Sequence, residues 1–570
     1  MTLHARMFGA ALAVTLAAVS VSGQQPRQVD DAMLMKPADG DWITYGRDQA
    51  ETHHSPLKQI DQSNVARLAP AWSVEVGSDG KIETTPLVFD GVLYGTSTWS
   101  QVYAVDLRSG KLKWKWDPGL VRAGYEADGP RACCGPVNRG VALYKGRVYV
   151  GLLDGRLVAL NAQTGLPEWA VQTTPAGSDY TITGAPRVIK GRVVIGQGGA
   201  EYGVRGFLAG YDADTGKLAW KFYVIPGDPA KGFEDEALAR AAKTWNGQWW
   251  KAGGGGTPWD GIAYDPALNL IYVGTGNGSP WNAQHRSPGG GDNLYLASIV
   301  ALNADTGKYV WHYQTSPGDN WDFNAAQPMI LADIQMGNTV RKVIMQAPKN
   351  GFFYVLDRTD GKLLSGDAYA YTSWATGIDM KTGRPIETEQ ARYRYTPVRL
   401  SPSPVGAHHW PPMAYNPATG LVYYPGQETS MVAAMEEKFE YKEGQWNLGM
   451  RMGTRPGADG KVSENVPNDP KAPAMGGFFV AWDPVAKKAA WRIPFQPSGG
   501  ALSTAGNLVF VGNSAGKLFA FDPQTGKNLW ETQMLTGGVG TPITYELDGK
   551  QYVAVMAGIQ KGRVYSFGLR

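Results

Sequence analysis

The chain has 570 residues and is nearly balanced in charge, with 54 Lys and Arg residues against 51 Asp and Glu residues. A net charge of +3 without a dense Lys/Arg block gives no reason to expect nucleic acid or an acidic membrane as a partner. The 73 glycines, 20 tryptophans and 27 tyrosines, with only 18% charged residues, indicate many turns and many buried aromatic side chains. This composition is typical of a large all-β protein.

The first element in chain order is an apolar N-terminal segment. His4 and Arg6 precede an apolar run over residues 7–21, and small residues follow up to Gln24. The run is short for a transmembrane helix and has the charged start and small-residue end of a signal peptide. Residues 1–23 are therefore interpreted as a signal peptide, with an uncleaved anchor as the alternative. The mature chain is expected to be periplasmic, with no transmembrane span.

The only two cysteines of the chain, Cys133 and Cys134, are adjacent in the run RACCGPVNRG. Consecutive Cα atoms lie about 3.8 Å apart, below the roughly 4.4–6.8 Å of an ordinary disulfide, so a bond between them would close a small ring. An exported chain meets oxidants that permit such a bond. The alternative is a pair of small buried thiols that happen to be neighbours.

One short phrase recurs along the chain: a strand, a turn that begins with Asp or Asn, and a second strand, with a Gly in the turn and a Trp after it in most copies. The Asp or Asn side chain can bond its own backbone, Gly supplies the positive φ that closes the turn, and the Trp begins the next strand with a large apolar face. The copies lie at residues 104–114, 159–169, 210–220, 301–311, 355–364, 481–491 and 520–530, with weaker copies at 263–276 and 414–427. Most gaps are close to the roughly 40–55 residues of one four-stranded propeller blade.

These tryptophan-docking repeats predict a single all-β domain over residues 24–570, an eight-bladed β-propeller, with seven blades as the competing count. The strand at residues 68–76 has no turn phrase before it, so its partner strand is expected from the far end of the chain, which closes the ring. Insertions near 226–256, partly helical, and 428–476, rich in Gly and Pro, are expected around the mouth of the central channel. Functional groups of such folds lie in loops of this kind.

Five longer pieces carry a resemblance to a known family: CCGPVNRG, TGAPRVIKGRVVIGQGGAEYGVRG, GTPWDGIAYDPALNLIYVGTGN, SPGDNWDFNAAQPMIL and APKNGFFYVLDRTDG. In this order they resemble the pyrroloquinoline quinone (PQQ) dependent alcohol dehydrogenases, including methanol and ethanol dehydrogenases and the quinoprotein part of soluble quinohaemoprotein alcohol dehydrogenases. The likeness extends from about residue 42 to residue 567. It implies an enzyme that oxidises a small alcohol with PQQ and passes electrons to a cytochrome c or similar acceptor.

The resemblance also implies which residues hold the quinone. Cys133 and Cys134 are implied to form a disulfide over one face of the ring system, with Trp259 under the other, since a flat cofactor needs flat apolar walls. The carboxylates of PQQ need donors and positive charge. The matching positions are Glu83, Arg139, Thr183, Gly199, Ala200, Thr257 and Lys349.

A divalent cation is implied by the same resemblance. Glu201 and Asn277 are its implied ligands, and Asp322 borders it as the catalytic base. Oxygen ligands without a thiolate describe a site for a hard ion, which favours Ca²⁺. Relatives that use lanthanides carry an acid two residues after the base, where this chain has Asn324. Lys349 stands where methanol dehydrogenases have Arg, and it can still polarise the quinone carbonyl.

Three positions depart from the family pattern: Gly198 in place of Ser, His409 in place of Asn, and Ser498 in place of Trp or Asn. They affect the edge of the cofactor site and leave open a PQQ-dependent sugar, polyol or polymer dehydrogenase. A non-catalytic propeller scaffold is the remaining alternative. The chain has no CxxCH haem motif, so electrons are expected to leave to a separate carrier.

Overall fold

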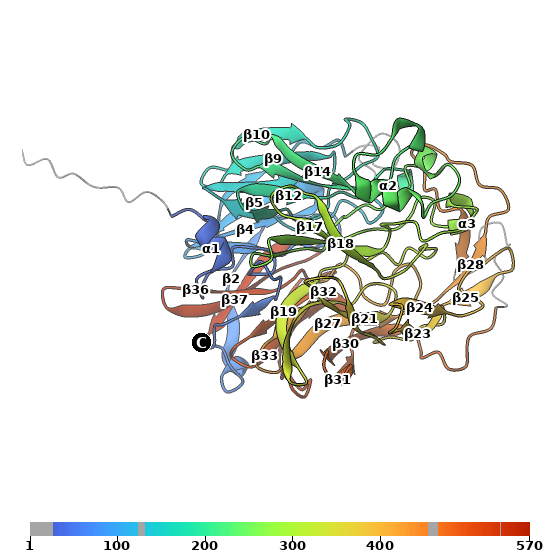
Figure 1. The fold of residues 1–570 in the computed structure, drawn as a ribbon. Helices are drawn as coiled ribbons and strands as arrows, with labels where there is room; N and C mark the ends of the chain where they lie inside the picture. Colours follow the sequence, from blue (N-terminus) through green and yellow to red (C-terminus); the bar gives the residue numbers. More distant parts are fainter. Residues whose placement is uncertain (1–26, 123–131, 454–465, 536) are drawn as a thin grey trace, which may run out of the picture.

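The computed structural model describes residues 27–122, 132–453, 466–535 and 537–570, so the predicted signal peptide lies outside it. In this part of the chain β-strands dominate, which confirms the all-β prediction (Figure 1). The strands form eight sheets of four or five strands, one sheet of three strands and one of two. The described residues contain no helix long and apolar enough to cross a bilayer.

Five sheets follow each other directly along the chain, each with neighbouring strands in an antiparallel meander. They consist of β3 (Leu87–Phe89), β4 (Val92–Thr96), β5 (Val102–Asp106) and β6 (Lys111–Trp116); β7 (Ala142–Tyr144), β8 (Arg147–Gly151), β9 (Arg156–Asn161) and β10 (Pro167–Gln172); β11 (Arg187–Ile189), β12 (Arg192–Ile195), β13 (Phe207–Asp212) and β14 (Leu218–Tyr223); β15 (Ile262–Asp265), β16 (Leu270–Gly274), β17 (Ser298–Asn303) and β18 (Tyr309–Gln314); and β19 (Ile330–Met336), β20 (Thr339–Gln346), β21 (Phe352–Asp357) and β22 (Leu363–Ala368).

The other three large sheets lie in the C-terminal third, and two of them include an N-terminal strand. They consist of β26 (Ala414–Asn416), β27 (Leu421–Glu428), β30 (Gly476–Asp483) and β31 (Lys488–Pro494); β32 (Pro497–Thr504), β33 (Leu508–Asn513), β34 (Lys517–Phe521) and β35 (Asn528–Gln533) with β1 (His54–Ser55); and β36 (Ile543–Leu547), β37 (Lys550–Ala557) and β38 (Arg563–Leu569) with β2 (Leu68–Glu75). The antiparallel pairing of β2 with β38 confirms that the first Trp-bearing strand finds its partner at the far end of the chain (Figure 1).

Most of the repeat tryptophans pack against the turn glycine of a neighbouring sheet, whereas Trp530 instead packs against Phe567 and donates to the Leu68 backbone oxygen. A Cβ atom at Gly165 would lie 2.6 Å from the Trp114 ring, and one at Gly361 would lie 2.4 Å from the Trp311 ring. The Trp114 Nε1 also donates a hydrogen bond of 3.0 Å to the backbone oxygen of Ala162. Glycine is thus required twice at these turns, for its positive φ and for the absence of a side chain under the indole.

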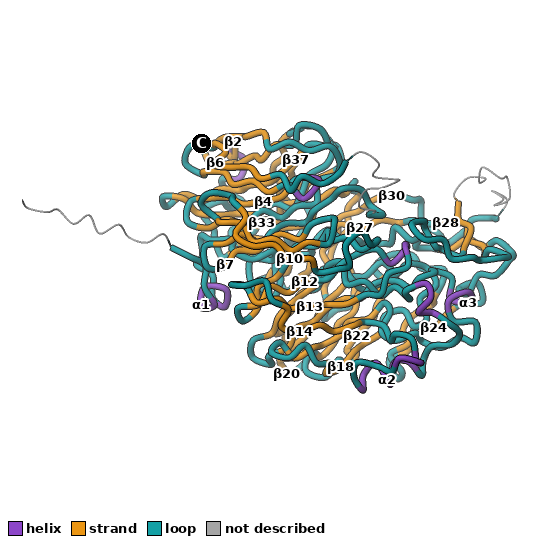
Figure 2. The backbone as a smooth tube through the Cα atoms, turned by 90° about the horizontal axis from the view of Figure 1, so that it is seen from above, coloured by secondary structure: helices purple, strands orange, loops and turns teal. Residues whose placement is uncertain are grey.

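The segments between and beyond these sheets gather at one end of the molecule, away from α1 (Asp31–Met35). They include α2 (Glu236–Ala242), which lies in the predicted insertion near 226–256, and α3 (Ala283–Arg286). The same end carries a sheet of β23 (Ala375–Asp379) and β24 (Arg384–Glu387), and one of β25 (Val398–Leu400), β28 (Met431–Met435) and β29 (Met450–Gly453). Figures 1 and 2 agree in placing α2, α3 and β28 on the side opposite to α1.

An N-terminal segment, residues 42–55, links many of the sheets. Its backbone oxygens accept hydrogen bonds from Tyr264, Leu331, Tyr415 and Ser503, which lie on or next to four different sheets. Trp42 forms a bridge to β3, and β1 adds a parallel strand to β32. This segment therefore ties together parts of the chain that are far apart in sequence.

Candidate active site

One cavity of about 860 Å³ brings together nearly all the site residues predicted from the sequence. Its walls include Glu83, Cys133, Cys134, Arg139, Thr183, Gly199, Glu201, Thr257, Trp259, Asn277, Asp322 and Lys349. Ala200 is buried between two of these residues but does not line the cavity. Because the residues come from loops of many different sheets, only the packing of those sheets makes them neighbours.

Asp322 and Lys349 form a buried pair in this cavity. Lys349 Nζ donates to Asp322 Oδ2 at 2.8 Å, and Asn324 Nδ2 donates to Asp322 Oδ1 at 2.9 Å. Burial raises the pKa of Asp322 well above its usual value despite the neighbouring lysine. Burial by itself would lower the pKa of Lys349, but the Asp322 charge outweighs it and raises that pKa.

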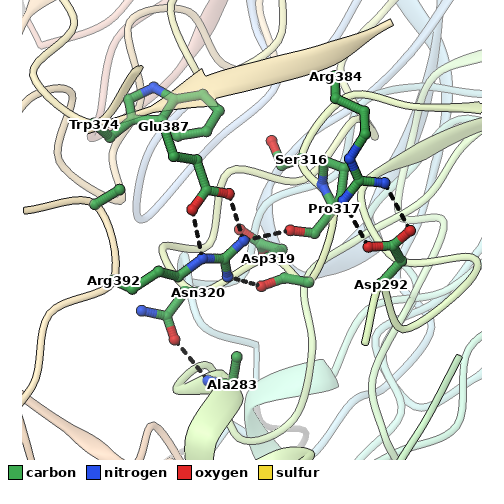
Figure 3. Close-up of polar contacts among 12 residues, drawn as sticks. Ala283, Asp292, Ser316, Pro317, Asp319, Asn320, Trp374, Arg384, Glu387 and Arg392 are labelled. Atoms are coloured by element: carbon green, nitrogen blue, oxygen red, sulfur yellow. Dashed lines mark hydrogen bonds and ion pairs between the residues drawn. The ribbon is translucent and has the colours of Figure 1, made fainter. Parts of the chain in front are cut away.

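The backbone at Asp322 is left-handed, with φ at +63°. This conformation costs a non-glycine residue about 1–3 kcal/mol and persists only where the surroundings enforce it. Figure 3 shows polar contacts that hold the segment just before Asp322 in the chain. Arg392 donates to the backbone oxygens of Pro317 and Gly318, and Asn320 Oδ1 accepts from the Ala283 amide at 2.6 Å. The surrounding contacts therefore supply the constraint.

Glu201 and Asn277 lie side by side, as a shared ion would require. Asn277 Nδ2 donates to Glu201 Oε1 at 3.2 Å, which leaves the Asn277 side-chain oxygen free. The glycine run before Thr257 packs directly against the Asn277 backbone. Gly256 N donates to the Asn277 backbone oxygen at 2.7 Å. A Cβ atom at Gly255 would lie 2.3 Å from the same oxygen, so only glycine fits there. In the described part of the chain no three His, Cys, Asp or Glu side chains are grouped to hold a metal. A hard ion here would therefore depend on the amide oxygen of Asn277 as well as on carboxylates, which suits Ca²⁺.

Arg139 is the second buried cation of the cavity. Its Nη2 forms an ion pair of 2.7 Å with Glu83 Oε2, and its Nη1 donates to Thr183 Oγ1 at 2.7 Å. The guanidinium carbon lies 4.9 Å from the centre of the Trp259 ring. An aromatic plane flanked by buried Arg139 and Lys349 fits a flat cofactor that carries carboxylates.

The adjacent cysteines are free thiols in this structure, so the disulfide implied by the family resemblance is not formed in it. The two Sγ atoms lie 2.8 Å apart, longer than the roughly 2.05 Å of a disulfide bond. The contact raises the pKa of Cys133 and lowers that of Cys134, because the second thiolate accepts the hydrogen bond of the first thiol. Both side chains line the cavity, so they can form one of its walls in either redox state.

The three positions that depart from the family pattern also line the cavity. The His409 ring stacks on Trp259 with centroids 5.4 Å apart and planes 18° apart. Burial, together with nearby Lys349 and Arg139, lowers the pKa of His409 well below its usual value, so the ring is neutral. Ser498 Oγ accepts from the Val539 amide at 2.8 Å, and Gly198 bonds the backbone of a neighbouring strand end.

The sequence placed the insertion near 428–476 around the mouth of the channel but did not identify which of its residues reach the cavity wall. Trp446 and Met452 line the cavity. Trp446 Nε1 donates to the Tyr202 hydroxyl at 2.8 Å, and Asn447 N donates to the Glu201 backbone oxygen at 2.8 Å. The only signal for this in the sequence was a lone Trp within a polar stretch, which has no periodicity from which to place it.

Comparisons with known proteins identify the family of this chain. The family model of the PQQ dehydrogenases, described as the β-propeller domain of glucose, ethanol and alcohol dehydrogenases, matches residues 42–366 and 384–553. The chain is 51% identical to the quinohemoprotein alcohol dehydrogenase ADH IIB of Pseudomonas putida, over 96% of this chain and 77% of that protein. It is 50% identical to the quinohemoprotein alcohol dehydrogenase of Comamonas testosteroni, over 93% of this chain and 74% of that protein.

Solved structures give the same result. The crystal structure of the Comamonas testosteroni enzyme superposes with a TM-score of 0.89 at 47% identity, covering 95% of this chain and 82% of that chain. A europium-containing methanol dehydrogenase superposes with a TM-score of 0.84 at 32% identity, covering 94% and 99%. Fold and site together define a β-propeller dehydrogenase that uses a bound quinone. The chain belongs to the family of PQQ-dependent alcohol dehydrogenases.

Proposed function

We propose that this chain is an exported quinoprotein that oxidises small alcohols to aldehydes or ketones with PQQ and Ca²⁺, and passes the electrons to a cytochrome c or a similar carrier. The observation that carries this proposal is the convergence of three pairs on one cavity: Asp322 with Lys349, Glu201 with Asn277, and Trp259 with Arg139. These pairs supply a base, a set of hard oxygen ligands and a wall for an anionic aromatic cofactor.

We further propose that the eight large sheets are the eight blades of one ring. The pairing of β2 with β38 supports closure between the two ends of the chain. The Trp–Gly contacts between neighbouring sheets support a constant inter-blade packing. The cavity would then lie at one end of the central axis, with Trp446 and Met452 of the second insertion in its wall.

The residues present fit the cofactor and the ion. Arg139, Thr183 and Lys349 would hold the carboxylates and carbonyls of PQQ, Trp259 and the cysteine pair would face its ring, and Glu201 with Asn277 would hold Ca²⁺. When bound, PQQ supplies the two-electron acceptor and Ca²⁺ supplies Lewis acidity at its carbonyl. Within the protein itself, Lys349 carries the positive charge nearest to the proposed base.

Asp322 is the proposed general base. Its Oδ2 is held by Lys349 and its Oδ1 by Asn324, so the carboxylate is fixed in orientation while its edge faces the cavity. Removal of the hydroxyl proton by Asp322 increases the electron density on the alcohol oxygen and so makes the α-hydrogen a better hydride donor. A positioned base of this kind contributes about 10²–10⁴-fold to the rate.

One relative supports the proposed electron carrier, and the N-terminal sequence supports the proposed location. The chain is 46% identical to a protein named 1-butanol dehydrogenase (cytochrome c) from Thauera butanivorans, over 91% of this chain and 75% of that protein. This supports a cytochrome acceptor. Residues 1–23 would direct the chain to the periplasm, and mass spectrometry of the mature protein would reveal cleavage near Gln24.

A sugar, polyol or polymer substrate is the second candidate, because His409 and Ser498 change the cavity lining. One experiment separates the candidates. The purified protein is given PQQ and Ca²⁺, and reduction of an artificial dye is followed with alcohols, polyols, aldoses and poly(vinyl alcohol). We expect activity with simple primary alcohols and none when NAD replaces PQQ. Dye reduction that does not depend on PQQ would refute the proposal.

A further inference from the structure

Behind the Trp259 wall, a buried carboxylate lies between two arginines. Asp260 is 2% exposed. Its Oδ2 is 3.7 Å from Arg139 Nε, and its Oδ1 is 3.9 Å from Arg187 Nη2. Both distances exceed the roughly 2.7–3.2 Å of an N–H···O hydrogen bond. Asp260 therefore balances the charge of both arginines without touching either of them directly.

Where Asp260 approaches Arg139, the polar atoms of both side chains lack hydrogen-bond partners. Neither carboxylate oxygen of Asp260 has a hydrogen bond to the described residues, and neither does Arg139 Nε. Buried charged groups without hydrogen bonds are costly, and native proteins satisfy such groups with internal water. Polar contacts longer than about 3.5 Å, such as the distances of 3.7 and 3.9 Å here, can be bridged by a water molecule.

The two arginines differ in what holds their other atoms. Arg187 is fixed by Glu51 through contacts of 2.6 and 3.2 Å, and it donates to the Ala185 backbone oxygen at 2.7 Å. Glu51 belongs to the segment 42–55 that joins several sheets. Arg139, by contrast, uses its Nη atoms on Glu83 and Thr183 in the cavity wall, so that only its Nε faces Asp260.

We propose that Asp260 is a positioning residue: it binds a small cluster of internal water molecules that bridges its carboxylate to Arg139 and Arg187, and this cluster holds the Arg139 guanidinium in the cavity wall. The proposal rests on the proposed function only in taking Arg139 as a partner of PQQ. Without the Asp260 charge, the buried Arg139 would lose the anchor on its Nε side.

The test compares Asp260→Asn with a matched control, Asp265→Asn. Asp265 is equally buried, but Arg358 Nε contacts it directly at 2.5 Å, and it does not line the cavity. PQQ affinity is measured by quenching of tryptophan fluorescence in the presence of Ca²⁺. We expect Asp260→Asn to weaken PQQ binding by about tenfold, and Asp265→Asn to keep the affinity of the unmodified protein while losing thermal stability. Unchanged affinity in Asp260→Asn, or equal losses in both variants, would overturn the proposal.

A high-resolution crystal structure of the unmodified protein tests the water cluster even if Asp260→Asn fails to fold. We expect ordered water within hydrogen-bond distance of both Asp260 oxygens and of Arg139 Nε. A dry site would refute the proposal. Should the unmodified protein not bind PQQ at all, the proposed function would fail, while the crystal structure would still decide whether the water bridge exists.

Discussion

Two regions of the molecule are built in opposite ways. Between neighbouring sheets one contact recurs, in which a Trp such as Trp169 or Trp311 covers the glycine of the next turn. Around the cavity no such contact recurs: Asp322, Arg139 and Asp260 each have a different set of neighbours. The repeated contacts bury large apolar surfaces, whereas the cavity buries charged groups at a cost in stability. We therefore expect substitutions between the sheets to affect folding and substitutions around the cavity to affect chemistry.

The largest effect is expected from Asp322→Asn. The amide keeps the size of the carboxylate but cannot accept the hydroxyl proton, so turnover should fall by about 10²–10⁴-fold. PQQ affinity, measured by fluorescence quenching, should change little. Glu201→Gln is the matched variant: it should weaken the binding of Ca²⁺, and excess Ca²⁺ should restore part of its activity. If both variants lost activity with the same Ca²⁺ dependence, the assignment of Asp322 as the base and Glu201 as the Ca²⁺ ligand would be wrong.

The next largest effect is expected at the Trp–Gly contacts between neighbouring sheets. Trp311→Ala removes the indole that covers Gly361 and should lower the free energy of unfolding by about 3–5 kcal/mol. Activity per folded molecule should remain close to that of the unmodified protein. Urea unfolding monitored by circular dichroism, together with active-site titration by PQQ, would measure both. Lost turnover in a variant with unchanged stability would contradict the division between the two regions.

A third effect depends on pH and grows as the pH falls. His53 is 1% exposed, and burial lowers its pKa to about 3. Since the unfolded chain takes up a proton below a pH of about 6.5 and the folded chain does not, His53 contributes stability that is lost as the pH falls from 6.5 towards 3. The loss is about 1.4 kcal/mol per pH unit. His53→Phe keeps a ring against Trp42 and Tyr45 and should show a shallower decline in unfolding free energy over this range.

The smallest effect on stability is expected at the cysteines. A loop closed between neighbours restrains almost no unfolded chain, so replacing both Cys133 and Cys134 with Ala should leave the unfolding free energy nearly unchanged. PQQ-linked turnover should fall because a wall of the cavity is altered. The pair is reduced in this structure, so mass spectrometry of the unreduced protein tests whether the disulfide implied by the family resemblance forms, which would make the pair two hydrogens lighter than free thiols. Full activity in the double variant would mean that the pair has no functional role.

Much of the fold could be predicted from local patterns. In the turn that begins at Asp212, the Asp212 side chain accepts a hydrogen bond of 2.9 Å from the Thr215 amide, as the sequence predicted for an Asx-led turn. The Trp that follows each turn and the unpaired strand at residues 68–76 were also correctly interpreted. These features depend on residues close together in the chain, so their physical cause is visible in the sequence itself.

The site was only partly predictable. The sequence and its family resemblance named Asp322, Glu201 and Asn277, and the structure places them around one cavity. They gave no sign that Trp446 would close a wall, or that Asp260, next to Trp259 in the chain, would lie between Arg139 and Arg187.

The sequence by itself determined the β-strands, the tryptophan-docking turns and the residue types that can hold a quinone and a hard ion. Which charged groups pair in the interior depends on the tertiary structure. Glu51 and Arg187, for example, are in contact although they lie 136 positions apart in the chain. The physical reason is that turns and strands follow from neighbouring residues, whereas the neighbours of a buried charge depend on how distant sheets pack.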